Sequence, residues 1–333
     1  MRIVFMGTPE FAVPSLELLA EKGDVALVVT RPDAVRGRGR DLVPSPVKAA
    51  AQRLGLPVLE ARRVSDEVLA AVADAAVDVV CVAAYGAILP DELLGMTRLG
   101  CVNVHASLLP RWRGAAPIQR AVLAGDERAG VSIMRIAHDL DAGAWCRQAS
   151  TEVADKPCAE LMAELARLGA RELARALDEM GRGVAVWHEQ DESLVTLAPK
   201  ITKEEMRLDP ADPALANKRR VQASLDAAPA RLVVGGRGVR AMGAALSGRD
   251  VAEGEVEVDH GRVFLGCADG ALELTLVKPD GKREMPASAW AQGLKAPGRK
   301  GKGAAAGSTA GSGAGSTAGA AADAAPRLTW SRA

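Results

Sequence analysis

Two polar side chains lie at the end of a short apolar strand near residue 100. Asn103 and His105 alternate with valines in the sequence Cys-Val-Asn-Val-His. In a β-strand this alternation points both polar side chains to the same face. An amide donor beside an imidazole can polarise a carbonyl group and manage a proton. The same pattern also fits an asparagine and a histidine that are only hydrogen-bonded at a strand end, and the spacing does not separate the two hypotheses.

An irregular loop follows this strand directly. It runs from Ser107 to Gln119 with the sequence Ser-Leu-Leu-Pro-Arg-Trp-Arg-Gly-Ala-Ala-Pro-Ile-Gln. Open α/β sheets place their ligand sites where strands end in such loops. No nucleophile signature surrounds Ser107, so we do not expect an acyl-enzyme on this serine. The chemistry is expected to come from the strand end and the loop together.

The elements that must hold this strand are indicated by apolar runs that alternate with helix-like stretches. Strands are predicted at 3–6, 25–29, 57–59, 77–83, 102–104, 131–136 and 144–151, and helices at 13–21, 46–54, 65–74 and 158–180. Alternation at this spacing predicts an α/β fold with a doubly wound parallel sheet. Gly181-Arg182-Gly183 is expected to end the last helix.

The pattern changes in the second half of the chain. Short β-like segments broken by glycines begin after about residue 206 and predict a second, smaller β-barrel domain. The residues from about 296 onward are mostly Gly, Ala, Ser and Thr without apolar periodicity. We therefore predict a first domain over 1–184, a polar linker over 185–205, a barrel over 206–295 and a disordered tail over 296–333.

Composition limits the possible partners. The chain has 333 residues with 42 Lys and Arg against 42 Asp and Glu, so overall charge does not indicate a nucleic-acid partner. The five cysteines are dispersed without a Cys-x-x-Cys pair, so neither a disulfide framework nor a zinc site is indicated. The first residues do not read as a signal peptide, and no apolar run approaches the roughly 20 residues of a membrane span. We expect a cytoplasmic protein with no metal and no membrane contact.

The stretch from Asn103 to Gln119, together with Leu140-Asp141-Ala142-Gly143, resembles the signature of the folate-dependent formyltransferases. That family is read as Asn and His on a strand, a Ser-Leu-Leu-Pro loop, and Asp in a Leu-Asp-x-Gly turn. Four further segments look like the same family, at 2–12, 44–48, 84–90 and 190–193. The resemblance covers most of residues 1 to about 206 and is much weaker beyond.

The resemblance implies specific roles. It implies a Rossmann-like formyltransferase domain followed by an OB-like barrel, with Asn103, His105 and Asp141 as catalytic residues. The co-substrate is expected to be 10-formyltetrahydrofolate. The residues implied to bind it are Ser107, Leu108, Leu109, Pro110, Ile88 and Leu89.

Within the family, the match is to members that formylate the α-amino group of methionine on initiator tRNA. The arginines of the loop after the second predicted strand are then expected to contact tRNA, with Arg38 first and Arg36 and Arg40 beside it. A monomer fits the family. Where the family has an Asn-Pro-Trp-Pro-like segment, this chain has Asp226-Ala227-Ala228-Pro229-Ala230, which leaves the tRNA contacts of the barrel undefined.

Other hypotheses stay open. A related folate enzyme could use another amine or water as acceptor, and a non-catalytic tRNA-binding protein could share the scaffold. Asp141 could serve only in an Asx turn, and most arginine-rich segments are simply solvated surface. Gly7-Thr8-Pro9 lacks the later glycines of a dinucleotide fingerprint, so NAD or FAD binding is disfavoured.

Overall fold

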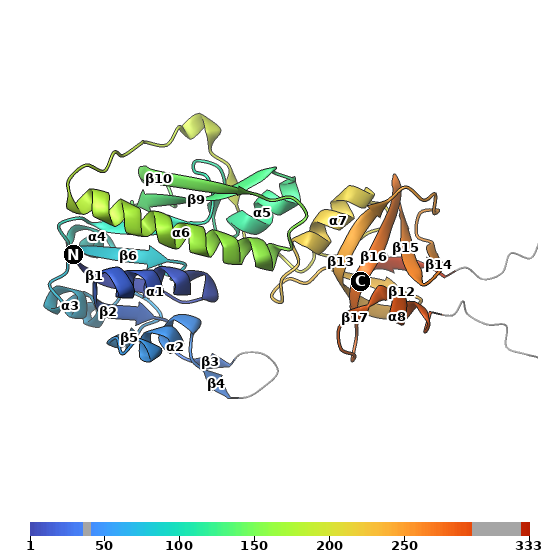
Figure 1. Cartoon of the computed structure of the whole chain (residues 1–333), viewed down its shortest axis with the longest axis horizontal. Helices are drawn as coiled ribbons and strands as arrows, with labels where there is room; N and C mark the ends of the chain where they lie inside the picture. Colours follow the sequence, from blue (N-terminus) through green and yellow to red (C-terminus); the bar gives the residue numbers. More distant parts are fainter. Residues whose placement is uncertain (36–40, 295–327) are drawn as a thin grey trace, which may run out of the picture. The chain divides into compact units, whose positions relative to one another are not determined.

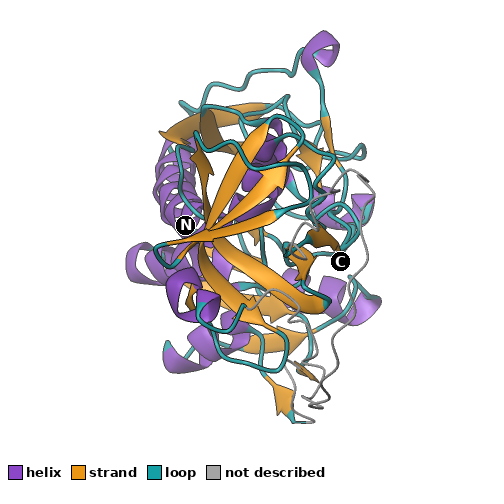
Figure 2. Ribbon diagram, turned by 90° about the vertical axis from the view of Figure 1, so that its right-hand side faces the viewer, coloured by secondary structure: helices purple, strands orange, loops and turns teal. Residues whose placement is uncertain are grey.

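The computed structural model describes residues 1–35, 41–294 and 328–333. These residues form two compact units, Met1–Ile201 and Thr202–Ala333 (Figure 1). The ribbon in Figure 2 shows strands fanned into twisted sheets with helices packed on them. Each unit is described by itself below.

The first unit is built on a sheet with strand order β10-β9-β7-β6-β1-β2-β5. Its strands are β1 (Arg2–Gly7), β2 (Asp24–Thr30), β5 (Val58–Glu60), β6 (Val79–Ala83), β7 (Cys101–His105), β9 (Arg128–Arg135) and β10 (Trp145–Glu152). Strands β5, β2, β1, β6 and β7 run parallel, whereas β9 pairs antiparallel with both β7 and β10. The predicted doubly wound parallel sheet is therefore confirmed, with an antiparallel pair added at one edge.

Helices cover both faces of this sheet. The helices of the first unit are α1 (Val13–Lys22), α2 (Pro46–Arg53), α3 (Asp66–Asp74), α4 (Asp91–Gly95), α5 (Pro117–Ala124) and α6 (Cys158–Gly181). Because both faces are covered, every residue of β6 is buried, as is typical of parallel sheets. Ser45 caps α2 by accepting a hydrogen bond from the backbone of Lys48.

The long helix α6 packs on strands β9 and β10, at one side of the sheet (Figure 1). Gly169 permits its close approach, because a Cβ atom there would lie 2.6 Å from a methyl group of Val104. Val104 lies on β7 between Asn103 and His105, so α6 packs against the strand that carries both polar residues. Among the described helices, none is long and apolar enough to span a bilayer.

Short elements complete the first unit. They are the 3-10 turns Glu10–Ala12 and Glu192–Leu194 and the short strands β3 (Ala34–Val35), β4 (Leu42–Val43), β8 (Arg113–Gly114) and β11 (Leu197–Ala198). Strand β11 pairs in parallel with β8, so the predicted linker lies against the first unit at this point rather than in solvent.

The second unit is a curled antiparallel sheet with strand order β14-β15-β16-β13-β12-β18, and β17 pairs with β16. Its strands are β12 (Arg231–Val234), β13 (Arg237–Ser247), β14 (Val256–Asp259), β15 (Arg262–Cys267), β16 (Gly270–Pro279), β17 (Met285–Pro286) and β18 (Trp330–Arg332), with helices α7 (Ala214–Gln222) and α8 (Ala287–Ala291). This architecture agrees with the smaller barrel domain that was predicted.

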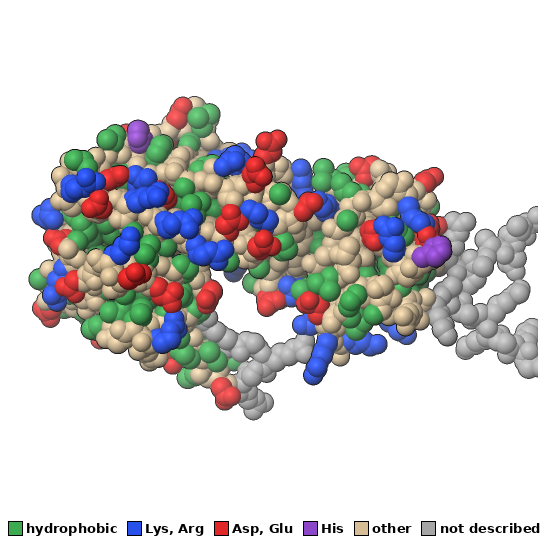
Figure 3. Space-filling model, in the orientation of Figure 1, with side chains coloured by type: hydrophobic (Ala, Val, Ile, Leu, Met, Phe, Trp, Pro, Cys, Tyr) green, Lys and Arg blue, Asp and Glu red, His purple; other side chains and the backbone are tan. Residues whose placement is uncertain are grey.

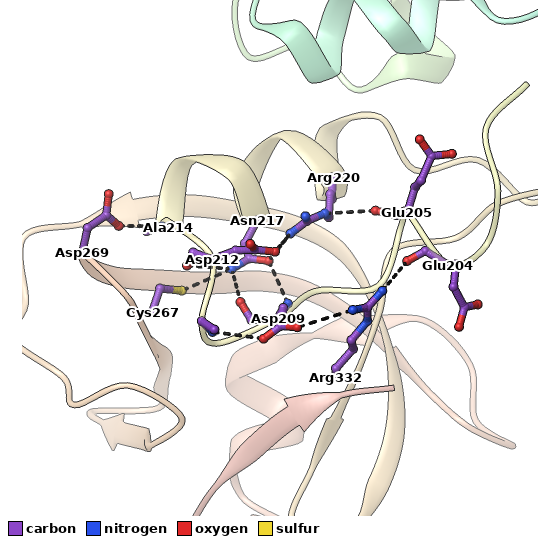
Figure 4. A network of polar contacts seen from close by, with 11 residues as sticks. Glu204, Glu205, Asp209, Asp212, Ala214, Asn217, Arg220, Cys267, Asp269 and Arg332 are labelled. Atoms are coloured by element: carbon purple, nitrogen blue, oxygen red, sulfur yellow. Dashed lines mark hydrogen bonds and ion pairs between the residues drawn. The ribbon is translucent and has the colours of Figure 1, made fainter. Parts of the chain in front are cut away.

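A buried asparagine organises the start of the second unit (Figure 4). The Asn217 side chain is fully buried, accepts from the Asp209 backbone and donates to the Asp209 carbonyl. Arg220 donates to the same Asn217 oxygen, and the Arg332 guanidinium lies near Asp209. Buried amides need such partners because an unpaired polar group in the interior is costly.

The prediction of disorder over 296–333 is wrong for its last residues. Strand β18 pairs antiparallel with β12, and Trp330 is 3% exposed within the core of the second unit. The Trp330 indole donates to the Gly266 carbonyl at 2.9 Å. The composition of the whole segment is dominated by Gly, Ala, Ser and Thr, so it gave no sign of an ordered strand at its end. The buried Trp330 supplies the apolar contact area that the preceding Gly and Ala residues lack. Residues 295–327 lie outside the described part of the chain.

Trp330→Ala should destabilise the second unit by about 3–5 kcal/mol, since it removes a large buried side chain. Trp330→Phe should cost less, because most of the apolar contact is kept and mainly the bond to Gly266 is lost. Urea denaturation followed by far-UV circular dichroism measures both. Equal midpoints for Trp330→Ala and the wild type would show that β18 does not belong to the core.

Candidate functional site

Asn103 and His105 lie at the carboxyl end of β7, as predicted. The Asn103 side chain is half-buried, and its amide forms no hydrogen bond with any residue that the structure describes. The His105 side chain is 5% exposed. Neighbouring β6 and β1 end at the same edge, and this is where the strand order reverses between β1 and β6. Such a reversal opens the crevice in which α/β sheets bind ligands.

His105 is held between two acceptor groups. Its Nε2 lies 2.9 Å from the Trp112 carbonyl oxygen, and since a carbonyl only accepts, Nε2 donates. Its Nδ1 lies 3.6 Å from Oδ2 of Asp141, which is longer than a hydrogen bond. Nδ1 is therefore the ring nitrogen that can exchange a proton. A proton on it faces a carboxylate.

Asp141 lies in a turn whose backbone is in the left-handed region, with φ of +49°. Its Oδ2 accepts from the Gly114 backbone at 2.9 Å, and its carbonyl accepts from Gln190 at 2.8 Å. The carboxylate thus contacts residues distant in sequence, which argues against the Asx-turn hypothesis. Of the predicted trio, the structure brings Asp141, from the loop between β9 and β10, to His105, while Asn103 lies two residues earlier on β7.

The loop after β7 is fixed by a fully buried serine on β9. Ser132 donates to the Ser107 carbonyl at 2.7 Å and accepts from the Leu109 backbone at 3.0 Å. Gln148 on β10 donates to both Ser132 and the Leu109 carbonyl. The Ser107 hydroxyl donates to the Arg111 carbonyl within the loop, consistent with a structural role for this serine.

The residues predicted to bind folate fall into two groups. Ser107 and Leu109 are buried in the loop, with Leu108 and Pro110 half-buried beside them. Ile88 follows β6, next to β7 in the sheet, and is 91% exposed, whereas Leu89 packs on the core. An exposed isoleucine at the carboxyl edge suits a ligand with an apolar ring.

The predicted tRNA-binding residues Arg36, Arg38 and Arg40 lie outside the described residues. Arg31, at the start of the same segment, donates to the Gly86 carbonyl in the loop after β6. Of the other three histidines, His138 and His260 are largely exposed, and His188 stacks on Trp145.

Sequence reasoning missed a set of residues beside the trio. Gln190 and Thr196, assigned to a linker, hydrogen-bond the Asp141 turn and the Trp112 backbone respectively. The match of residues 190–193 to the family was a signal that could have drawn attention to Gln190, whereas nothing in the sequence marked Thr196.

Four of the five cysteines are buried. Burial raises the pKa of the Cys101 and Cys158 thiols to about 12, so both stay protonated at neutral pH. The five cysteines, all within the described ranges, are free. Over the same ranges, no group of three His, Cys, Asp or Glu residues is placed to hold a metal ion.

Comparison with known proteins identifies the family. The formyl transferase family model matches residues 1–177, and the model of the formyl transferase C-terminal domain matches residues 200–295. The chain belongs to the formyltransferase family. The methionyl-tRNA formyltransferase of Halorhodospira halophila is 45% identical over 299 residues, covering 88% of this chain and 96% of the relative. That of Acidothermus cellulolyticus is 40% identical over 323 residues, covering 90% and 99%.

Solved formyltransferase structures share the fold at low identity. WlaRD, a sugar 3N-formyl transferase solved with dTDP and 5-N-formyl-THF, gives a TM-score of 0.61 at 12% identity, covering 85% of this chain and 99% of that chain. HypX from Aquifex aeolicus, solved with tetrahydrofolic acid, gives 0.60 at 18% identity, covering 87% and 46%. At these identities the likeness establishes the formyltransferase fold alone.

Ser132→Ala should destabilise the first unit by about 1–3 kcal/mol, because it leaves the buried Leu109 amide and Ser107 carbonyl without their partner. Amide hydrogen exchange should accelerate at Leu109, and the urea midpoint should fall. Ser150→Ala on β10 is the matched control, since Ser150 accepts from exposed Arg128. Unchanged exchange at Leu109 would contradict the role given to Ser132.

Proposed function

We propose that this protein transfers the formyl group of 10-formyltetrahydrofolate to the α-amino group of methionyl initiator tRNA, for translation initiation. The observation that carries the proposal is the approach of Asp141 to His105, two residues after Asn103 on the same strand, in a chain that is 45% identical to a methionyl-tRNA formyltransferase. Two features support it: within the described residues the Asn103 amide has no hydrogen-bond partner, and Nδ1 of His105 can exchange a proton.

Asn103 supplies the electrostatic part of the reaction. Attack of the neutral amine on the formyl carbon places negative charge on the formyl oxygen, and the bond to N10 then breaks. The uncommitted Asn103 amide is the donor to that oxygen, a role worth about 3 kcal/mol. In the neutral ring Nε2 carries the proton, so Nδ1 becomes the second donor only after it takes the proton of the attacking amine, which it then passes to N10 as that bond breaks.

His105 and Asp141 handle the proton that the attacking amine loses. The Trp112 carbonyl fixes Nε2 as a donor, so proton exchange takes place at Nδ1, beside the carboxylate. Asp141 orients the ring and stabilises its charged form. Such acid–base work contributes roughly 100- to 10,000-fold to the rate.

The carboxyl edge of the sheet suits the folate co-substrate. The apolar side chain of Ile88 and the loop from Ser107 to Pro110 flank the strand end that carries Asn103. These residues would hold the pterin, with Leu89 supporting the first loop from the core. Folate-bound solved structures share this fold.

Local patches rather than net charge would hold the tRNA. Basic and acidic side chains intermix over the visible faces of both units (Figure 3), in keeping with zero net charge. Arg38, with Arg36 and Arg40, remains the proposed contact to the acceptor arm. We also propose a cytoplasmic monomer, in keeping with the free cysteines.

The test is formylation of charged initiator tRNA by the purified protein, with charged elongator methionine tRNA as the control acceptor. Formylation of the initiator species alone supports the proposal. Release of formate without an acceptor would instead identify a folate hydrolase. Binding of tRNA without any formyl transfer would identify a non-catalytic binding protein.

Asn103→Ala should lower kcat by about 100- to 1,000-fold, as expected for loss of an oxyanion donor. His105→Ala and Asp141→Ala should each lower it by roughly 100- to 10,000-fold. Steady-state kinetics with saturating folate, checked by circular dichroism, gives the values. Wild-type turnover in a folded variant would remove that residue from the mechanism.

Arg38→Ala should raise KM for tRNA while leaving folate binding unchanged, because an arginine on this loop is expected to contact phosphate. Arg36→Ala and Arg40→Ala should cost less and serve as matched charge controls. Fluorescence titration with the folate and kinetics with tRNA separate the two substrates. If folate binding weakens in step with tRNA use, the loop serves the folate pocket instead.

A further inference from the structure

The segment 188–198 contacts both sides of the His105–Asp141 pair. We propose that Gln190 and Thr196 are positioning residues that hold Asp141 and the acceptor of His105 in place for formyl transfer. This inference rests on the proposed function. It holds that a segment outside the α/β sheet keeps the His105–Asp141 pair in its catalytic arrangement.

Gln190 fixes the turn that carries Asp141. Its Nε2 donates to the carbonyl oxygens of Asp141 and Gly143, both at 2.8 Å. The turn has little freedom around these bonds, because a Cβ at Gly143 would lie 2.0 Å from the Arg135 carbonyl oxygen. Asp141 itself has a left-handed backbone, which an L-residue rarely adopts without external support. Gln190 supplies two of the bonds that stabilise this conformation.

Thr196 acts on the other side of the ring. Its hydroxyl oxygen accepts from the Trp112 backbone at 2.9 Å, and its carbonyl accepts from the Arg113 backbone at 2.9 Å. Trp112 also has a left-handed backbone, with φ of +65°, and presents its carbonyl to His105. The indole of Trp112 is held by Asp126 at 2.8 Å. Thr196 and Asp126 therefore set where the acceptor of Nε2 lies.

The segment is itself anchored at several points. Trp145 and His188 exchange backbone hydrogen bonds and stack their rings. Arg113, whose side chain is 8% exposed, donates to Gln190 at 2.9 Å and to Glu192 at 2.7 Å. These contacts give Gln190 a fixed orientation, because its oxygen accepts from Arg113 while its nitrogen donates to the turn. A loosely held side chain could not fix the turn.

Positioning through another residue predicts a distinct kinetic pattern. A displacement of about 1 Å at a reacting group can cost about 100-fold in rate. Gln190→Leu keeps the size of the side chain but removes both donors, so kcat should fall about 10- to 100-fold. KM for 10-formyltetrahydrofolate should stay within about twofold, because Gln190 does not belong to the folate loop.

The decisive measurement is a double-mutant cycle. In an Asp141→Ala background the turn no longer presents a carboxylate, so adding Gln190→Leu should cause no further loss of residual rate. Thr196→Val should lower kcat, and Thr196→Ser, which restores the hydroxyl, should recover it. Ser193→Ala is the matched control, because the Ser193 side chain bonds only Asp191 in the described structure.

An activity-independent measurement separates this inference from the proposed function. The ¹⁵N resonances of the His105 ring should shift in Gln190→Leu and in Thr196→Val, but not in Ser193→Ala. Unshifted resonances in both folded variants would overturn the inference even if the wild type proves inactive on methionyl-tRNA. Equal losses from Gln190→Leu with and without Asp141 would also overturn it. An inactive wild type with shifted resonances would leave the positioning intact and remove the proposed reaction.

Discussion

A buried imidazole with an acceptor at each ring nitrogen is the constraint on which this structure depends. His105 is nearly excluded from water, so its Nε2–H must find a partner in the protein, and it finds the Trp112 carbonyl. That bond leaves Nδ1 for Asp141 and the substrate. The loop after β7, the turn before β10 and the segment near 190 are all arranged to keep these two acceptors in place.

The sheet supplies the rigid frame for this arrangement. Because β9 runs antiparallel to β7, Ser132 lies opposite His105 in the register and can bond the returning loop. The same register puts the end of β9 beside the start of β7, since Arg135 lies opposite Val102. The loop after β9 must therefore return along β7 to bring the Asp141 carboxylate to 3.6 Å from His105.

The sequence predicted the elements whose apolar period is strong and whose neighbours are local. Two signals were sufficient to predict a doubly wound sheet. They are the buried apolar runs of β1 and β6 and the helical apolar spacing that is sustained along α6. It did not predict β13, whose Ala and Gly residues carry no strand-like apolar period. It also missed β18, because pairing with β12 is a contact across nearly a hundred residues.

The candidate site shows the same division. Asn103 and His105 could be placed on one face from two-residue spacing, and Asp141 came from the family resemblance. Gln190 and Thr196 could not be derived from period or propensity, since they act through single hydrogen bonds to backbone groups. Side-chain bonds to distant backbone leave no periodic trace in a sequence, so such residues become visible only when the chain is folded.

The two left-handed residues explain why this support is needed. Asp141 and Trp112 each hold a backbone conformation that costs on the order of 1–3 kcal/mol for a non-glycine residue. A single hydrogen bond contributes only about 1 kcal/mol net. Each strained residue therefore requires several bonds: Asp141 has Gly114 and Gln190, and Trp112 has Thr196, Asp126 and His105 itself. The His105 ring, which performs the proposed proton transfer, therefore also helps to hold the strained Trp112 backbone in place.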